Sequence, residues 1–153
     1  MQIKAIIHKL IQKYDTNNPF YIAKKRNILI FHQSLGGILG YHTVNRRVQM
    51  IYLNADLPDH MKSFVCAHEL GHSILHPQIN TPFLRQNTLL SVERIEREAN
   101  RFAVELSITD DDLSKHHPHG ITIQEASSIY GVPQELVTLK QFNTHNISLF
   151  FFV

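Results

Sequence analysis

The sequence lacks several features that would place it in a specialised class of protein. Its 153 residues include one cysteine, Cys66, which excludes an intramolecular disulfide framework and fits a reducing compartment. No apolar run approaches the roughly 18 residues that a membrane-spanning helix needs. The formal charge is only +2 and the basic residues are scattered, so no polyanionic partner is indicated. We therefore expect a cytoplasmic protein that binds neither a membrane nor, directly, a nucleic acid.

The sequence does contain enough apolar residues for one folded unit. A chain of 153 residues that is 43% hydrophobic suits a single globular domain whose core folds without disulfides. No internal repeat or low-complexity segment divides it. Its patterns predict an N-terminal helix and small sheet in residues 1–57, central helices in 58–107 and a helical extension in 108–153.

The first third of the chain predicts two helices and three strands. Residues 1–14 carry isoleucine and leucine at helical spacing, interrupted by lysines, which indicates an amphipathic helix and not a secretory signal. A short helix is predicted over 20–24. Residues 28–32 and 47–53 are rich in strand-forming residues, and 35–41 resembles a turn that leads into a middle strand. We expect these strands to form a small antiparallel meander.

Helical patterns dominate the rest of the chain. Pro58 suits the first position of a helix that runs to about Leu75 and ends before Pro77. After a polar loop, an apolar stripe predicts a second long helix near 92–106. Two shorter helices are predicted over Thr122 to Tyr130 and Pro133 to Lys140.

The most informative pattern is an H-E-x-x-H motif, His68-Glu69-Leu70-Gly71-His72, inside the first long helix. Residues four apart stand one helical turn above each other, so His68 and His72 can direct two imidazole nitrogens at one point. Glu69 lies about 100° further round the helix and can hold a water at that point without being a ligand. This spacing is typical of a hydrolytic zinc site.

A catalytic zinc usually takes three protein ligands, so two histidines predict a third downstream. Glu96 is the best candidate, because it lies about 70° from the centre of the apolar stripe of the second helix. Glu98 falls further round, toward solvent. Asn100, one turn after Glu96, could hydrogen-bond the outer nitrogen of a ligand histidine. The alternative is that Glu96 is a flanking residue paired with a neighbouring arginine.

These residues resemble a known family. Residues 68–76, H-E-L-G-H-S-I-L-H, followed by 96–106, E-R-E-A-N-R-F-A-V-E-L, are similar to the paired motifs of the ImmA/IrrE metallo-endopeptidases. The similarity is specific over roughly residues 45–110. Many members continue with a leucine-methionine-proline segment, where this chain has Ser-Ile-Thr-Asp at 107–110.

The resemblance implies a ligand set and a reaction. Zinc is then held by His68, His72 and Glu96, and Glu69 is the general base that assists attack of zinc-bound water on a peptide bond. The family includes proteins of phages and mobile elements that cleave their element's repressor. The expected partner is therefore a protein substrate, a transcriptional repressor, and the need for an activating partner protein is left open.

Together these observations predict an α+β protein, with a small antiparallel sheet of about three strands packed against a zincin-like helical core and additional C-terminal helices. The predicted function is zinc-dependent cleavage of a regulatory protein. One alternative is a non-proteolytic, metal-binding sensor or protein-binding module that regulates a transcription factor. A third hypothesis is a toxin-like or DNA-damage-response regulator that contacts DNA through its C-terminal helices. The presence of Glu69 favours catalysis, because closed structural zinc sites need no base.

Other features are interpreted as packing or as solvated surface. His76 is expected to close the helix end. Tyr41 and Tyr52 are expected to be packing residues, and His116, His117 and His119 to lie in a solvated loop. Residues 121–140 are expected to serve in packing or substrate docking. The apolar tail, 147–153, is expected to be buried against the chain itself.

Overall fold

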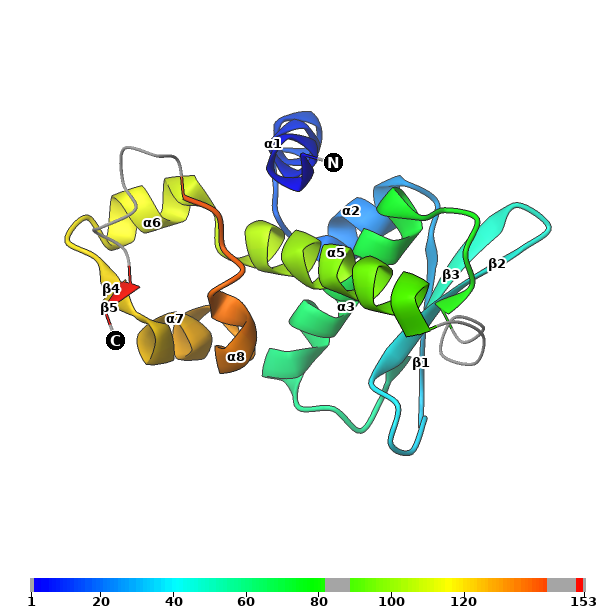
Figure 1. Cartoon of the computed structure of the whole chain (residues 1–153). Coiled ribbons are helices and arrows are strands. Elements are labelled where there is room, and N and C mark those ends of the chain that lie inside the picture. Colours follow the sequence, from blue (N-terminus) through cyan, green and yellow to red (C-terminus); the bar gives the residue numbers. More distant parts are fainter. Residues whose placement is uncertain (1, 82–88, 143–150, 153) are drawn as a thin grey trace.

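The structure is a computed structural model, which describes residues 2–81, 89–142 and 151–152. Two long helices, α3 and α5, pack against each other at the centre of the molecule (Figure 1). A three-stranded sheet lies at one end of this pair and the C-terminal helices lie at the other. The expected α+β class is confirmed.

In chain order the elements are α1 (Ile3–Tyr14), α2 (Pro19–Lys25), β1 (Leu29–Gln33), β2 (Gly40–Asn45), β3 (Val48–Asn54), α3 (Asp59–Leu75), α5 (Leu89–Ser107), α6 (Asp110–His116), β4 (Ile121–Thr122), α7 (Ile123–Tyr130), α8 (Gln134–Val137) and β5 (Phe151–Phe152).

The long helices begin and end close to where local signals predict. Pro58 is the N-cap of α3 and Asp59 lies in its first turn, where the helix dipole favours a negative charge. The helix ends at Leu75, two residues before a proline. The short helix α6 was not predicted. Thr109 caps it through a hydrogen bond from the backbone N–H of Asp112 (3.2 Å), but only Leu113 is buried, so no apolar stripe marked it.

The sheet differs from the predicted antiparallel meander. Its order is β1-β3-β2, with β2 antiparallel to β3 but β1 parallel to β3. Alternation of apolar residues predicts that a segment is a strand but does not specify its neighbour. The strand β3 takes the centre because its Ile51 and Leu53 are fully buried, whereas every residue of β1 is at least partly exposed.

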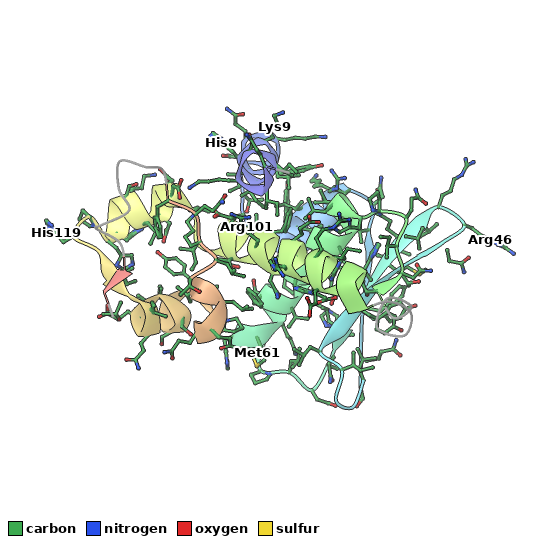
Figure 2. The ribbon with its side chains drawn as sticks, in the orientation of Figure 1. His8, Lys9, Arg46, Met61, Arg101 and His119 are labelled. Carbon is green, nitrogen blue, oxygen red and sulfur yellow. The ribbon has the colours of Figure 1, made fainter. Side chains whose placement is uncertain are left out.

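A tight hairpin joins the antiparallel pair. Arg46 and Arg47 both have positive φ, 48° and 67°, as a two-residue primed turn requires. Arg46 lies at the hairpin tip, while His8 and Lys9 project from α1 and His119 from the loop after α6 (Figure 2). These basic side chains come from separate elements and point in different directions, in agreement with a scattered charge.

The described part of the C-terminal tail pairs with its own chain. Phe151 and Phe152 form β5, which runs parallel to β4 with Ile121 opposite Phe151. The rest of the apolar tail, residues 147–150 and 153, lies outside the described residues. Tyr41 and Tyr52 stack on each other, with ring centroids 4.7 Å apart, as expected of packing residues.

Candidate metal centre

Helix α3 brings the two motif histidines together. The Nε2 atoms of His68 and His72 lie 3.0 Å apart, and their rings meet edge to face. His72 is almost completely buried, while part of His68 reaches a cleft. Their spacing of four residues produces this arrangement as soon as the segment is helical.

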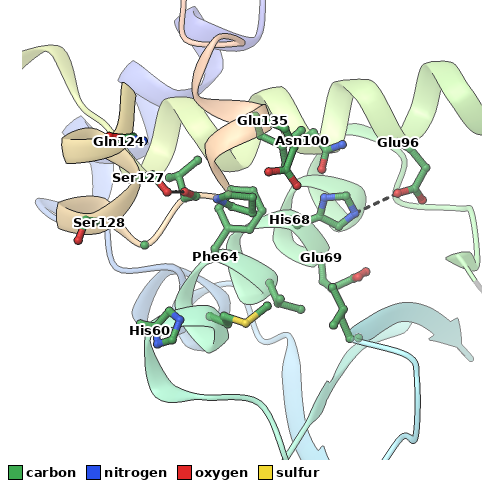
Figure 3. Close-up of a pocket in the computed structure, with 18 residues that line it drawn as sticks. His60, Phe64, His68, Glu69, Glu96, Asn100, Gln124, Ser127, Ser128 and Glu135 are labelled. Atoms are coloured by element: carbon green, nitrogen blue, oxygen red, sulfur yellow. Dashed lines mark hydrogen bonds and ion pairs between the residues drawn. The ribbon is translucent and has the colours of Figure 1, made fainter. Parts of the chain in front are cut away.

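Helix α5 supplies a carboxylate to the same point. Oε2 of Glu96 lies 3.2 Å from Nε2 of His68, and Oε1 of Glu96 lies 3.3 Å from Nε2 of His72. Figure 3 shows this side chain reaching across from α5 to the His68 ring. Within the described residues, these three side chains make up the single cluster that could hold a metal ion, with one ligand atom from each inside 4.8 Å.

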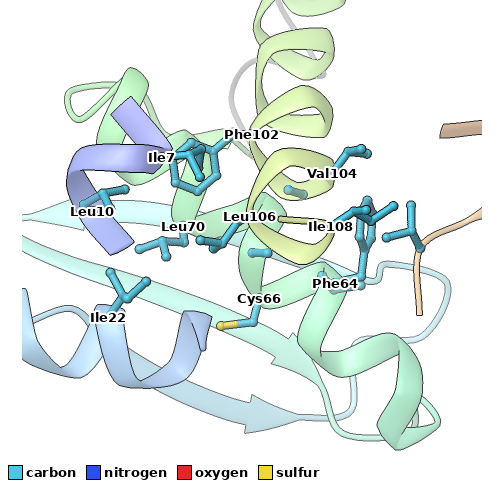
Figure 4. Close-up of a cluster of buried hydrophobic side chains, with 14 of the residues drawn as sticks. Ile7, Leu10, Ile22, Phe64, Cys66, Leu70, Phe102, Val104, Leu106 and Ile108 are labelled. Atoms are coloured by element: carbon cyan, nitrogen blue, oxygen red, sulfur yellow. The ribbon is translucent and has the colours of Figure 1, made fainter. Parts of the chain in front are cut away.

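The close packing of α3 on α5 makes this contact possible. A Cβ added at Gly71 would lie 3.0 Å from the ring of Phe102, closer than ordinary van der Waals contact, so glycine favours the close approach of the two helices. Phe102 is fully buried with Leu70 and Leu106 in the apolar cluster between the helices (Figure 4). Cys66 belongs to the same cluster, and burial raises the pKa of its thiol well above the usual range, as expected of a structural cysteine.

The charges of the cluster suit a cation. Burial by itself would raise the pKa of Glu96, but hydrogen bonds with His68 and His72 hold that pKa far below its usual range. Burial lowers the pKa of His72, and the neighbouring His68 adds to this, although Glu96 opposes it. An ionised carboxylate therefore faces two buried imidazole nitrogens that lie 3.0 Å apart. Two nitrogens and one oxygen are a donor set that zinc accepts, so the residues fit the metal.

Glu69 and Asn100 lie beside this cluster. Glu69 is 3% exposed, lines the same cleft as His68 and Glu96, and leaves α3 on the side of the sheet (Figure 3). The side chain of Asn100 hydrogen-bonds His68. Burial by itself would lower the pKa of His68, but Glu96, Glu69 and this hydrogen bond raise it. The structure thus brings all five predicted site residues to one place.

A second pair next to the cluster differs from the prediction. Glu98, expected to face solvent, is only 22% exposed and its Oε2 lies 2.7 Å from Nε2 of His76. His76 is the C-cap of α3, so this pair ties the helix end to α5. Its angle from the apolar stripe of α5 predicted that Glu98 would face solvent. The end of α3 covers this side of α5 as well, through His76.

The cleft in front of the cluster has a volume of about 800 Å³. One side is formed by α3 and the start of β2. The opposite side comes from α7, α8 and the turn between them, a segment for which the sequence left packing or substrate docking open. The residues of that side include Gln124, Ser127, Val132, Glu135 and Leu136.

Comparison with known proteins decides the family. The sequence profile of the IrrE N-terminal-like domain, a peptidase family, matches residues 23–140, a range that contains the whole cleft. The chain belongs to the ImmA/IrrE family. This confirms the resemblance found in the motifs, and the chain is therefore a member of a metallopeptidase family.

Two relatives extend over nearly the whole chain. One, named "Uncharacterized immunity region protein 2", is from Bacillus phage phi105 and is 41% identical over 142 residues, which cover 92% of this chain and 90% of the relative. The other, Metallopeptidase ImmA of Bacillus subtilis (strain 168), is 30% identical over 142 residues, which cover 90% of this chain and 83% of the relative. In the described residues, no helix is long and apolar enough to cross a membrane.

Proposed function

We propose that this member of the ImmA/IrrE family is a zinc-dependent endopeptidase that cleaves a regulatory protein, the repressor of a phage or other mobile element. The observation that carries the proposal is the convergence of His68, His72 and Glu96 at the wall of a cleft that Glu69 also lines. Three ligands leave a coordination position open, which is the arrangement of a catalytic site.

The residues have separate roles in this proposal. Zinc bound by His68, His72 and Glu96 would supply a Lewis acid that polarises a peptide carbonyl and makes water a nucleophile near neutral pH. Glu69 accepts the proton of the attacking water and passes it to the leaving amine nitrogen. Asn100 holds the His68 ring through its hydrogen bond, so that the ligand keeps one orientation.

The cleft indicates how a peptide chain would be bound. An extended substrate cannot pair with β2 along its whole free edge, because two backbone N–H groups of β2 already donate hydrogen bonds to side chains of the same chain. The N–H of His42 donates to Thr81 Oγ1 (2.8 Å) and that of Val44 to Asn80 Oδ1 (2.7 Å). Only the Gly40 end of β2 opens into the cleft. The substrate then lies between α3 and the α7–α8 side, where Phe64 and Leu136 favour apolar side chains.

The choice of a repressor as substrate rests on the relatives. The phage relative takes its name from an immunity region, and the relative from Bacillus subtilis is named a metallopeptidase. A protease of this kind works inside the cell, and a single buried thiol suits that location. A binding module without catalysis is the weaker hypothesis, because a metal that only stabilises a fold needs no carboxylate such as Glu69 beside an open ligand position.

Two substitutions test the proposal. We expect Glu69→Gln to retain one zinc per chain and lose cleavage of the repressor substrate by at least about 100-fold, because only the proton acceptor is removed. Glu96→Ala should lose both zinc and cleavage. Metal content is measured by elemental analysis and cleavage by electrophoresis and mass spectrometry.

A matched control is available on the same helix. Glu93 is exposed on α5, so Glu93→Ala should keep both zinc and cleavage. A chelator should abolish cleavage by the wild type and added zinc should restore it. Full cleavage by Glu69→Gln would exclude the mechanism, and full zinc occupancy in Glu96→Ala would remove Glu96 from the ligand set.

A further inference from the structure

A fully buried histidine lies on β2, a strand that packs against the metal-site helix α3. His42 lies on β2 with 0% of its surface exposed and is not among the residues that line the cleft. Thr81 Oγ1 accepts its backbone N–H (2.8 Å) and donates to its backbone C=O (3.1 Å). The ring Nδ1 lies 3.2 Å from the backbone oxygen of Ile79. Both the backbone and one ring nitrogen of His42 are therefore held in place.

The register of the sheet on α3 puts His42 beside the helical turn that ends at His72. At one end of β2, a Cβ at Gly40 would lie 3.0 Å from a methyl group of Val65. Further along, Nε2 of Gln49 on β3 donates to the backbone oxygen of Ser73 (3.0 Å). His42 shares a face with Gly40, because side chains alternate along a strand. It lies between these two contact points, beside the turn of α3 that runs from Glu69 to His72.

The hydrogen bonds of the two rings are complementary. Nδ1 of His42 faces a carbonyl oxygen, which can only accept, so this nitrogen carries the proton and Nε2 presents a lone pair. His72 directs its Nε2 at His68 and Glu96, so its Nδ1 carries the proton when Nε2 is a ligand. Within the described residues, Nε2 of His42 and Nδ1 of His72 are both buried without a hydrogen-bond partner. One is an acceptor and the other a donor.

The electrostatics agree with this pairing. Burial lowers the pKa of His42 to about 4, the hydrogen bond with Ile79 opposes this, and the nearby His72 lowers it further. His42 is thus neutral at physiological pH, so its Nε2 can accept a hydrogen bond. A buried donor or acceptor without a partner is unfavourable, so a contact that joins the two atoms stabilises the fold that buries them.

We propose that His42 is a positioning residue for the metal centre: its Nε2 accepts the Nδ1 proton of His72 through one bridging water molecule. This contact holds the His72 ring in the tautomer and orientation that direct Nε2 toward His68 and Glu96. Ligand histidines usually donate their outer N–H to a carboxylate or a carbonyl, and here a neutral imidazole takes that place. The inference rests on the proposed zinc peptidase and names a residue outside both motifs.

Zinc affinity of three variants tests this role, measured by competition with a chromophoric chelator. We expect His42→Leu, which removes the acceptor, to weaken zinc binding by about 10- to 100-fold. His42→Gln should recover most of that loss, because its amide oxygen reaches about as far as Nε2. Thr81→Val removes the hydroxyl that holds the same backbone but leaves the imidazole, and should bind zinc within about threefold of the wild type.

Two results would overturn the proposal. The first is a folded His42→Leu that binds zinc as tightly as the wild type. The second is equal weakening in His42→Leu, His42→Gln and Thr81→Val, which would show a structural role only. If the variants do not fold, nitrogen-15 NMR of the zinc-loaded wild type decides: the proposal requires Nε2 of His42 without a proton and a His72 Nδ1 proton protected from exchange, and a proton on Nε2 of His42 would overturn it. Unchanged zinc binding in Glu96→Ala would instead remove Glu96 from the ligand set, which counts against the proposed function and not against His42.

Discussion

At the scale of single residues, the middle of the H-E-L-G-H motif has a packing role as well as a chemical one. Gly71 lies on α3 next to His72 and faces the ring of Phe102 on α5. A Cβ added at Gly71 would lie 3.0–3.1 Å from three side-chain atoms of Phe102. Phe102 is fully buried, so a shift of its ring would disturb the residues packed around it. The short separation of α3 and α5, and hence the reach of Glu96 to the histidines, depends on the missing side chain.

Gly71→Ala should therefore destabilise the protein and weaken its metal site. Overpacking costs about 1–3 kcal/mol, and the better helix propensity of alanine returns up to about 1 kcal/mol. We expect a net loss of about 1 kcal/mol in urea unfolding, with weaker zinc binding. Gly37→Ala is the control, because a Cβ there meets nothing within 4 Å, and its stability should change by less than about 0.5 kcal/mol. An unaltered zinc affinity in Gly71→Ala would contradict this account.

At the scale of elements, α5 connects the metal centre to the far side of the cleft. Near its start Glu96 and Asn100 contact α3, and near its end Glu105 holds the segment after α8. The carboxylate of Glu105 accepts from Nζ of Lys140 (2.6 Å) and from the backbone N–H of Gln141 (2.6 Å). Both side chains of the ion pair are only 1% exposed. Because water cannot replace either partner, this contact keeps α7 and α8 in place opposite the histidines.

Lys140→Met should unfold at a lower denaturant concentration than the wild type. Removing one member of a buried pair leaves the other charge uncompensated and costs about 3–5 kcal/mol. The double variant Glu105→Gln with Lys140→Met should recover part of this loss. Lys115→Met removes an exposed pair with Asp111 on α6 and should leave the unfolding midpoint unchanged. Equal midpoints for Lys140→Met and the wild type would show that the pair contributes nothing.

At the scale of the whole molecule, Asp110 connects the N-terminal helix α1 to the segment that follows α8. It contacts Nζ of Lys4 on α1 and Nζ of Lys140, each at 2.7 Å. Burial by itself would raise the pKa of Asp110, but Lys140 and Lys4 hold it below the ordinary value. A depressed folded-state pKa stabilises the protein above the ordinary pKa, and the contribution disappears as the pH falls through the folded value.

Asp110→Asn should be less stable than the wild type at pH 6, and the difference should shrink below about pH 4 as the wild-type carboxylate is protonated. The side chain is 45% exposed, so solvent screening limits the effect to about 1 kcal/mol. Urea unfolding at pH 6 and pH 3 measures it. Asp111→Asn, on the exposed face of the same helix, should behave as the wild type at both. A difference that grows toward acid pH would reverse the assigned sign.

The sequence by itself determined the parts of this protein that depend on local spacing. The bounds of α3, the position of His68 and His72 on one face and the placing of Glu69 beside them follow from 3.6 residues per turn. The angle from an apolar stripe also selected Glu96, and the structure puts that carboxylate between the two histidines. Its role as a ligand stays a prediction.

Only the tertiary structure decided the sheet order, the pairing of His76 with Glu98, the burial of His42 on a strand that packs against α3, and the α7–α8 side of the cleft. Each depends on contacts between segments far apart in the chain, and periodicity carries no information about which faces meet. A strand pattern is the same whether its neighbour is parallel or antiparallel, and a buried histidine looks like any other until the partner of each ring nitrogen is known.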